Sequence, residues 1–200
     1  MTAPRLILAS TSPYRRELLQ RLKLPFETRS PGIEETALPG EAAADLALRL
    51  ALAKARAVAA EVADAVVIGS DQVAELDGAC IGKPHSHERA RQQLTSMSGR
   101  EVQFHTAVAV VRSDGGFERA VVAPVSVRFR HLSAAEIERY LRLDTPYDCA
   151  GSAKCESLGV ALLESIHSDD PTALIGLPLI RTCALLRLAG LDPLSGTTFA

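Results

Sequence analysis

The sequence predicts a mixed α/β fold, in which one sheet is bent or split into two lobes with a cleft between them. In the first half of the chain, short apolar runs alternate with helical patterns, which is typical of parallel strand–helix units. Further on, residues 101–112 and 117–130 alternate in polarity around Asp114-Gly115-Gly116, which is typical of an antiparallel hairpin. The 200 residues are 47% hydrophobic and 23% charged, so they can bury a sizeable core.

Four elements are expected before residue 65. They are a strand over residues 5–10, a helix over 13–23, a short strand over 26–28 and a long helix over 41–62. Ser12 is a suitable N-cap for the first helix, and Pro13 fits its first position, where the missing N–H costs nothing. The expected apolar stripe of the long helix consists of Leu46, Leu50, Ala53 and Ala57. Lys54 lies at the flank of this stripe, where its stem can pack while its ammonium reaches out.

The apolar run over residues 65–69 predicts a strand that is buried on both faces. This strand delivers Ser70, Asp71 and Gln72 to its C-terminal end, where ligand crevices lie in open α/β sheets. Asp77-Gly78 is a hairpin turn signal. The returning segment therefore brings Lys83 toward the same end as Asp71.

The remaining elements are predicted by their caps and turns. They are a helix over 87–97 capped by Ser86, the hairpin over 101–130, a helix from the capping box Ser133–Glu136 to about residue 143, a polar loop over 151–156, a strand over 158–165 and a helix over 172–189 between Asp170 and Gly190. Residues 1–200 are expected to form a single domain of two lobes.

Arg15 and Arg16 lie in the first turn of the helix after Ser12, beside the positive end of the helix dipole, where two cations are unfavourable. A bound anion removes this conflict. The hydroxyls of Ser10 and Ser12, both guanidinium groups and free backbone N–H groups would then converge on a phosphate. The alternative, in which both arginines extend into water, stays open at this point.

Asp71, after a buried strand, is the candidate catalytic carboxylate. Lys83, one hairpin away, could bind phosphate or orient a water molecule that Asp71 deprotonates. Glu35, in an acidic loop, offers a second carboxylate, although a solvated loop is the alternative for it. Together with triphosphate oxygens, Glu35 and Asp71 would form an oxygen-only site for a divalent metal cation, Mg²⁺ or Mn²⁺.

Seven short motifs occur together and in order. They are Ser10-x-Ser12-x-x-Arg15-Arg16, Glu35-Thr36, Lys54, Gly69-Ser70-Asp71-Gln72, Gly82-Lys83-Pro84, Gly151-Ser152-x-Lys154-x-Glu156 and Gly176-Leu177-Pro178. With this combination the chain resembles the Maf family of nucleotide pyrophosphatases over nearly its whole length.

The resemblance implies an elongated mixed sheet with a central cleft, similar to the inosine triphosphate pyrophosphatases. It also implies metal-dependent hydrolysis of a nucleoside triphosphate to a monophosphate and pyrophosphate. In that family the residue matching Asp71 is the proton acceptor, and the phosphate site is lined by those matching Ser10, Ser12, Arg15, Lys54 and Lys83.

Tyr14, Gln72 and Glu156 resemble the branch of the family that cleaves N7-methylguanosine triphosphate, whereas members acting on dTTP and UTP carry Arg, Thr and Gln at these positions. That branch often has Trp where this chain has Tyr14. N7-methylguanine is cationic, and an aromatic ring offers it a stacking surface worth about 0.5–2 kcal/mol. Glu156 can accept from the N1–H and N2–H edge of guanine, and Gln72 can donate and accept beside it, while a thymine or uracil edge would present carbonyl oxygens. The alternative for Tyr14 is a core position on the face of Leu18 and Leu22.

The expected function is therefore hydrolysis of 7-methyl-GTP, as house-cleaning of modified nucleotides. A dTTP/UTP pyrophosphatase and a nucleotide-binding regulator of septum formation are the alternatives. A net charge of −2 argues against a nucleic-acid partner, and no apolar run approaches the length needed to span a membrane. The lack of a separate signal-peptide segment and the four scattered cysteines favour a cytoplasmic location. The expected partner is a small nucleotide substrate, and the resemblance allows a homodimer.

Overall fold

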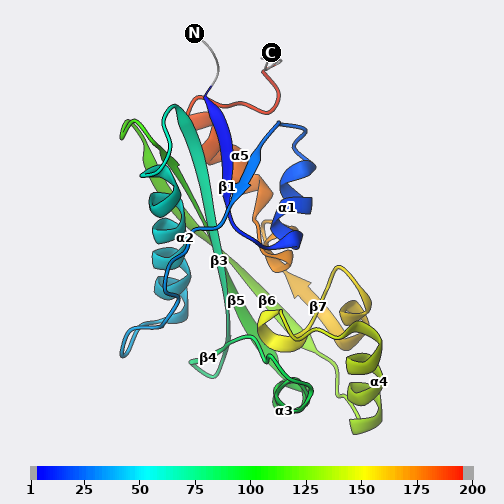
Figure 1. The fold of residues 1–200 in the computed structure, drawn as a ribbon. Coiled ribbons are helices and arrows are strands. Elements are labelled where there is room, and N and C mark those ends of the chain that lie inside the picture. The colour runs from blue at the N-terminus through cyan, green and yellow to red at the C-terminus, as the bar shows by residue number, and fades with distance from the viewer. Residues whose placement is uncertain (1–3, 196–200) are drawn as a thin grey trace.

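In the computed structural model, which describes residues 4–195, seven strands form one mixed sheet (Figure 1). Its order is β2-β1-β3-β5-β6-β7, and β4 pairs with β3. The strands are β1 (Arg5–Ala9), β2 (Glu27–Arg29), β3 (Ala65–Leu76), β4 (Ala79–Ile81), β5 (Glu101–Arg112), β6 (Glu118–Phe129) and β7 (Leu163–His167). β1 pairs in parallel with β2 and β3, and the other pairs are antiparallel. The mixed sheet that the sequence predicts is thus confirmed.

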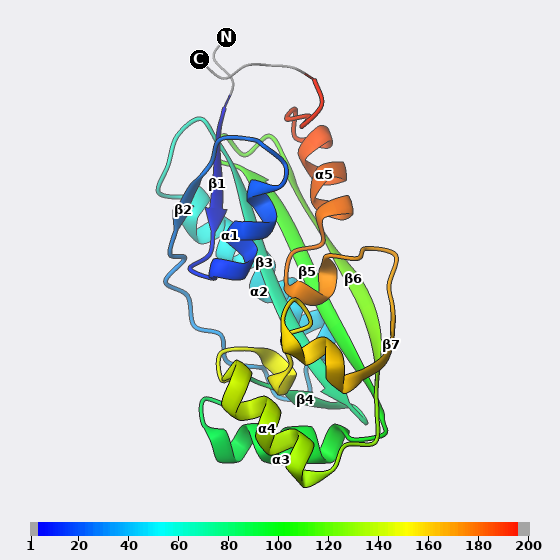
Figure 2. The same cartoon turned by 90° about the vertical axis from the view of Figure 1, so that its right-hand side faces the viewer.

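Five α-helices within residues 4–195 flank this sheet. They are α1 (Pro13–Gln20), α2 (Ala43–Ala59), α3 (His87–Met97), α4 (Ala134–Asp144) and α5 (Leu179–Leu188). Figures 1 and 2 show α2 on one face of the upper part of the sheet, α1 and α5 on the opposite face, and α3 and α4 packed together at the lower end. None of these helices is long and apolar enough to cross a bilayer.

The three longest strands, β3, β5 and β6, have 12 residues each and run through both ends of the molecule. At the upper end, alternate residues of β3 enter separate cores, because side chains alternate across a strand. Val67 packs under α2, and Ile68 packs under α1 and α5. At the lower end, Phe104 and Phe129 join a third core with α3 and α4. The two expected lobes are therefore joined by continuous strands.

One edge of β3 changes partner halfway along its length. β1 pairs with residues 65–68 of β3, and β4 pairs with residues 74–76. Between these stretches, residues 69–73 pair only with β5 in the described part of the chain. The sequence places Asp71 after a strand, but β3 continues to Leu76, because β5 pairs with it almost throughout. Asp71 therefore lies beyond the end of the parallel section only, beside an uncovered strand edge.

Elements with local end signals have the expected bounds. α3 covers the predicted residues and begins at Ser86, whose side chain caps it. β5 and β6 form the predicted hairpin, and Ser133 and Glu136 make both hydrogen bonds of the capping box. The first helix, by contrast, ends at Gln20 rather than residue 23, because Lys23 adopts a left-handed φ of 58°.

The strand expected over residues 158–165 is wrong. Residues 158–162 form the 3₁₀ helix η2 (Leu158–Leu162), and the strand β7 begins only at Leu163. The turn is tight because Gly159 lies backbone to backbone against Lys154, where a Cβ on Gly159 would come within 2.5 Å of the Lys154 carbonyl oxygen. The apolar pattern alone did not distinguish this turn from a strand.

The helix expected over residues 172–189 is broken into two. The 3₁₀ helix η3 (Ala173–Ile175) ends at Gly176, which has a φ of 123°, and α5 begins after Pro178. Asp170 still caps α5 across the break, because its Oδ2 accepts from the Arg181 backbone nitrogen at 3.1 Å. The break turns the Gly176 carbonyl toward the site described next.

Candidate active site

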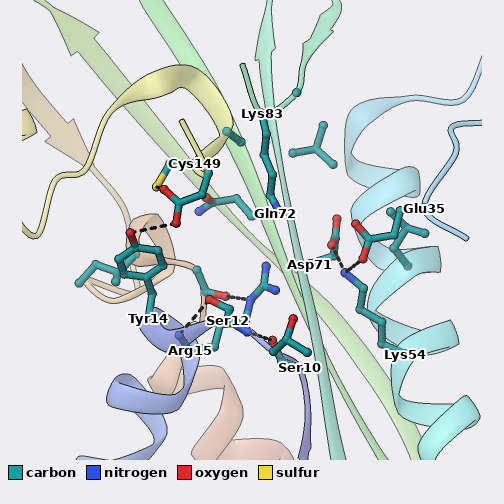
Figure 3. Close-up of a pocket in the computed structure, with 18 of the residues that line it drawn as sticks. Ser10, Ser12, Tyr14, Arg15, Glu35, Lys54, Asp71, Gln72, Lys83 and Cys149 are labelled. Atoms are coloured by element: carbon teal, nitrogen blue, oxygen red, sulfur yellow. Dashed lines mark hydrogen bonds and ion pairs between the residues drawn. The ribbon is translucent and has the colours of Figure 1, made fainter. Parts of the chain in front are cut away.

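A pocket of about 620 Å³ lies against the uncovered edge of β3, a size typical of small-ligand sites. Both lobes contribute to its walls, which include the loop after β1, the loop before α2, the loop after β4 and the segments around residues 148–156 and 174–176 (Figure 3). The predicted site residues that line it are Ser10, Ser12, Tyr14, Arg15, Glu35, Lys54, Asp71, Gln72, Lys83 and Glu156.

Arg16 is the one predicted site residue that the structure does not bring into the pocket. It is exposed on α1 and does not line the cavity. Neighbouring helical residues point about 100° apart, so Arg15 and Arg16 cannot both face one ligand. The expectation that both guanidinium groups converge is therefore corrected: Arg16 lies at the surface.

Two carboxylates hold the ammonium group of Lys54 (Figure 3). Its Nζ lies 2.6 Å from Asp71 Oδ1 and 2.7 Å from Glu35 Oε1. Lys54 is only 4% exposed and Asp71 7%, whereas the Glu35 side chain is 50% exposed. A buried ammonium needs compensating charge, and the two carboxylates supply it. Although burial opposes ionisation, the hydrogen bond with Lys54 and the charges of Lys54 and Lys83 lower the pKa of Glu35.

The close approach of α2 to β3 places Lys54 beside Asp71. A Cβ on Gly69 would lie 2.1 Å from the Ala51 carbonyl oxygen and 2.7 Å from the Ala55 nitrogen. Both atoms belong to the helix backbone, so only a glycine at residue 69 permits this spacing. Lys54 lies on the same turn of α2 as these two contacts.

The buried stripe of α2 differs from the predicted one. Leu46 and Leu50 are buried as expected, but the stripe continues through Lys54 and Val58, while Ala53 and Ala57 are half-buried. We expected Lys54 to lie outside the buried stripe because its side chain is charged. The sequence did not show that two carboxylates would compensate this charge.

The loop after β1 presents two hydroxyl groups to the pocket. Ser10 Oγ accepts from the Ser12 backbone nitrogen at 3.1 Å, and Ser12 Oγ accepts from the Arg15 backbone nitrogen at 3.4 Å. The second bond is the predicted N-cap of α1. Because both hydroxyl oxygens act as acceptors within the loop, their O–H groups remain as donors for a ligand.

Arg15 is oriented by the Gly176 carbonyl, a role that the sequence did not reveal. Arg15 Nε donates to that oxygen at 2.9 Å, and Ser70 Oγ donates to it at 2.9 Å as well. Burial lowers the pKa of the Arg15 guanidinium, while the charges of Asp71 and Glu35 raise it. With Nε bound, the two terminal nitrogens of the guanidinium group are left to face the pocket.

Lys83 enters the pocket from the loop after β4 (Figure 3). The Asp77-Gly78 turn, with left-handed φ angles of 53° and 80°, reverses the chain as predicted. The structure therefore brings Lys83 and Asp71 to the same cavity, which was the geometric expectation for the hairpin.

Tyr14 lies across the pocket from Lys54 and Glu35 (Figure 3). It is half-buried and lines the cavity, whereas Leu18 of the same helix enters the core, so the core alternative for Tyr14 is not what the structure shows. Its hydroxyl donates to Asp148 Oδ2 at 3.2 Å. Burial raises the pKa of Tyr14 to about 12, so the phenol stays neutral.

Gln72 offers the pocket an acceptor rather than a donor. Its Nε2 donates to Thr106 Oγ1 at 2.9 Å and to the carbonyl oxygens of Ala173 and Leu174 at 3.0 Å. No donor within residues 4–195 contacts its Oε1. Glu156, which is exposed, adds a second acceptor group to the lining. We expected Gln72 both to donate to a ligand and to accept from it. In the structure only its Oε1, an acceptor, is available to a ligand.

Asp148 and Cys149 also line the pocket, and sequence reasoning missed them. They precede the predicted polar loop and match no chemical pattern by themselves. Burial raises the pKa of the Cys149 thiol to about 12. The thiol therefore stays protonated and is a poor nucleophile.

The carboxylates of the pocket supply two of the oxygen ligands that a metal ion needs, and the other ligands must come from substrate and water. Nowhere in residues 4–195 do three His, Cys, Asp or Glu side chains gather as a metal site. Glu35 and Asp71 each use one oxygen for Lys54, and no donor in the described part of the chain contacts Glu35 Oε2 or Asp71 Oδ2. Mg²⁺ is commonly held by one or two carboxylates together with substrate phosphates and water. These oxygens fit a divalent cation of that kind.

A family model and two relatives of known sequence match nearly the whole chain. The family model described as Maf-like protein matches residues 5–189. A 7-methyl-GTP pyrophosphatase of Polaromonas sp. is 64% identical over 94% of this chain and 86% of its own length. One of Albidiferax ferrireducens is 61% identical over 95% of this chain and 96% of its own. Among solved structures, a HAM1 protein from Coxiella burnetii covers 63% of this chain and 73% of its own, with a TM-score of 0.46 and 19% identity. Because the family model spans β1 to the end of α5, this chain belongs to the Maf family.

Proposed function

We propose that this protein hydrolyses 7-methyl-GTP to the nucleoside monophosphate and pyrophosphate. The observation that carries the proposal is the contact of buried Lys54 with Asp71 and Glu35, in one pocket with the hydroxyl groups of the loop after β1 and the guanidinium group of Arg15 on α1. A phosphate-binding wall and a carboxylate suited to activating water thus meet in one cavity. Relatives at 64% and 61% identity bear the name 7-methyl-GTP pyrophosphatase, which supports this substrate.

The triphosphate is bound by hydrogen-bond donors of the loop after β1 and of the first turn of α1. Ser10 and Ser12 donate their hydroxyl protons, and Arg15 donates from its terminal nitrogens, to phosphate oxygens. Lys83 approaches from the opposite lobe, and Lys54 adds a positive charge from α2. These groups lie where negative charge increases as the anhydride breaks, so they stabilise the transition state as well as the ground state.

Asp71 acts as the proton acceptor. Its Oδ1 is fixed by Lys54 at 2.6 Å, which leaves Oδ2 to accept a proton from water. The water oxygen bonds to phosphorus as the α–β anhydride breaks, and pyrophosphate leaves with the electron pair of that bond. A positioned general base of this kind contributes about 10²–10⁴-fold to the rate.

Glu35 and Asp71 would also hold a divalent cation, Mg²⁺ or Mn²⁺, together with the substrate phosphates. Because a carboxylate oxygen has two lone pairs, Asp71 Oδ2 can contact such a cation with one of them and accept the proton with the other. When bound, such a cation supplies charge neutralisation on the phosphate oxygens. Removal of the cation with a chelator should abolish turnover, and addition of Mg²⁺ or Mn²⁺ should restore it. Activity that survives exhaustive chelation would contradict this assignment.

The base is selected by Tyr14, Gln72 and Glu156. The Tyr14 ring stacks on the purine, and the Glu156 carboxylate with Gln72 Oε1 accepts from the N1–H and N2–H edge of guanine. Thymine and uracil would direct carbonyl oxygens at these acceptors, which leaves polar groups unpaired and disfavours binding.

A phosphate-release screen tests the function. The protein is incubated with 7-methyl-GTP, GTP, dTTP or UTP in the presence of inorganic pyrophosphatase, and phosphate is measured with malachite green. We expect the highest kcat/KM for 7-methyl-GTP. A higher value for dTTP or UTP would overturn the substrate, and tight binding of nucleotides without turnover would favour a regulator.

The remaining expectations follow from this substrate. We propose that the chain works in the cytoplasm, where nucleotide pools are maintained, that residues 1–200 act as one domain, and that the protein is a homodimer. A solution mass near 21.3 kDa, that of a single chain, would contradict the homodimer.

A further inference from the structure

The Asp148 carboxylate and the Tyr14 ring form a corner of the pocket that already contains a cation. Asp148 Oδ2 accepts from the Tyr14 hydroxyl at 3.2 Å, so the carboxylate is fixed at the edge of the ring. Lys154 Nζ lies 5.7 Å from the centre of the same ring and 3.5 Å from Asp148 Oδ1. An aromatic face beside an anion is a setting in which organic cations bind favourably.

Lys154 neutralises Asp148 only in part. Its 3.5 Å contact is longer than a charge-assisted hydrogen bond, and the Asp148 side chain is 58% exposed. Lys154 Nζ also donates to the Asp144 carbonyl oxygen at 3.3 Å, which anchors it to the end of α4. Although burial opposes ionisation, Lys154 lowers the pKa of Asp148, so the carboxylate is charged at neutral pH. Glu156 adds a second carboxylate to the pocket near Asp148, while Lys154 is the ammonium in contact with Asp148 and Lys83 lines the same cavity.

Among the proposed base contacts, only stacking on Tyr14 separates GTP from 7-methyl-GTP, through its cation–π component. GTP and 7-methyl-GTP have the same N1–H and N2–H edge, so Glu156 and Gln72 contact both in the same way. The two bases differ only in the methyl group and in the positive charge that it creates. A residue that separates them must respond to one of these two features.

We propose that Asp148 determines specificity for the methylated base by attracting its positive charge, an inference that rests on the proposed function. Tyr14 stacks on the base, and Asp148, bonded to the edge of that ring, places a full negative charge beside the cationic purine. Unmethylated guanine is neutral and gains nothing from this charge.

The test compares two substrates of the same shape. In 7-methyl-7-deaza-GTP, carbon replaces N7, so the base keeps the methyl group but is neutral. We expect the wild-type protein to show about tenfold higher kcat/KM for 7-methyl-GTP than for this analogue, as for a charge pair a few ångströms apart at an exposed site. In Asp148→Asn, which keeps an oxygen for the Tyr14 hydroxyl, the ratio should fall to about two, the share that cation–π stacking on Tyr14 still provides.

Asp169→Asn is the matched control, because it removes the same charge from a side chain that is 93% exposed and does not line the pocket. Its ratio should equal that of the wild type. A loss of activity in Asp148→Asn that is equal for both substrates would overturn the inference and leave a structural role. An equal fall of the ratio in both variants would overturn it in favour of a general charge effect. If the wild-type protein cleaves 7-methyl-GTP and Asp148→Asn has the same ratio as the wild type, the inference alone is refuted. If the wild-type protein does not cleave 7-methyl-GTP, the proposed function and the inference are refuted together.

Discussion

The contact between α2 and β3 allows a quantitative test of how the fold positions the site. In Gly69→Ala the new methyl carbon would lie 2.1 Å from the Ala51 carbonyl oxygen and 2.7 Å from the Ala55 nitrogen. Carbon–oxygen contacts below about 3.3 Å are unfavourable, so the helix must move by about 1 Å. No flexible side chain can yield in its place, because both atoms are helix backbone. Lys54 moves with this turn, and its two ion pairs are displaced.

We expect this variant to lose both stability and activity. Overpacking of this kind costs about 3 kcal/mol, which lowers the Tm of a chain of this size by about 6–12 °C. A displacement of about 1 Å in the site lowers kcat/KM by about 100-fold. Thermal unfolding and phosphate release measure the two effects. Gly116→Ala is the control, since its Cβ would meet only the flexible Asp114 side chain at 3.1 Å. A Gly69→Ala protein with wild-type Tm and kcat/KM would refute the packing argument.

Four further predictions follow from the site and the helix caps. Asp71→Asn should lower kcat by about 10²–10⁴-fold, because it removes the proton acceptor, while circular dichroism stays that of the wild type; a rate within tenfold of wild type would exclude Asp71 as the base. Gly176→Ala strains a residue with φ of 123° and turns the carbonyl that orients Arg15, so KM should rise more than kcat falls; an unchanged KM would contradict this. Glu156→Gln should reduce the preference for 7-methyl-GTP over dTTP, measured as a ratio of kcat/KM, and an unaltered ratio would remove Glu156 from base selection. The Ser133 backbone and side chain and then Arg130 lower the pKa of Glu136 to about 2, so its contribution to stability is complete above its ordinary pKa and disappears as pH falls toward 2. The unfolding midpoint of Glu136→Gln should therefore lie below that of the wild type at pH 6 and approach it at pH 2.5.

Local signals were sufficient where an element ends by its own chemistry. Ser86, the Asp77-Gly78 turn and the Ser133–Glu136 capping box each fixed an element end correctly, since each supplies a hydrogen bond or a backbone conformation that its neighbours cannot override. The same holds for the Ser12 cap of α1. These ends position the loop of Ser10 and the hairpin of Lys83, which explains why most candidate residues could be named from the sequence.

Long-range contacts decide the features that the sequence did not predict. β3 extends to Leu76 because β5, which begins 25 residues later, pairs with it. Lys54 is buried because Glu35 and Asp71, distant in sequence, meet it. Asp148 lies in the pocket beside Tyr14, to whose hydroxyl it is bonded although the two are 134 residues apart. Neither hydrophobic period nor motif spacing contains this information.

The pocket exists because β1 is shorter than β3. Where β1 ends at Ala9, the chain leaves the sheet as the serine loop and enters α1, so the donors for phosphate lie directly beyond the last parallel pair. Asp71 follows three residues after that pair on β3, and the β4 hairpin returns Lys83 from the other side of the uncovered edge. Phosphate donors, carboxylate and lysine therefore come from three successive stretches along one strand edge. A longer β1 that paired with residues 69–73 would fill the cavity with backbone. The difference in length between β1 and β3 is therefore as necessary for the candidate active site as the side chains that line it.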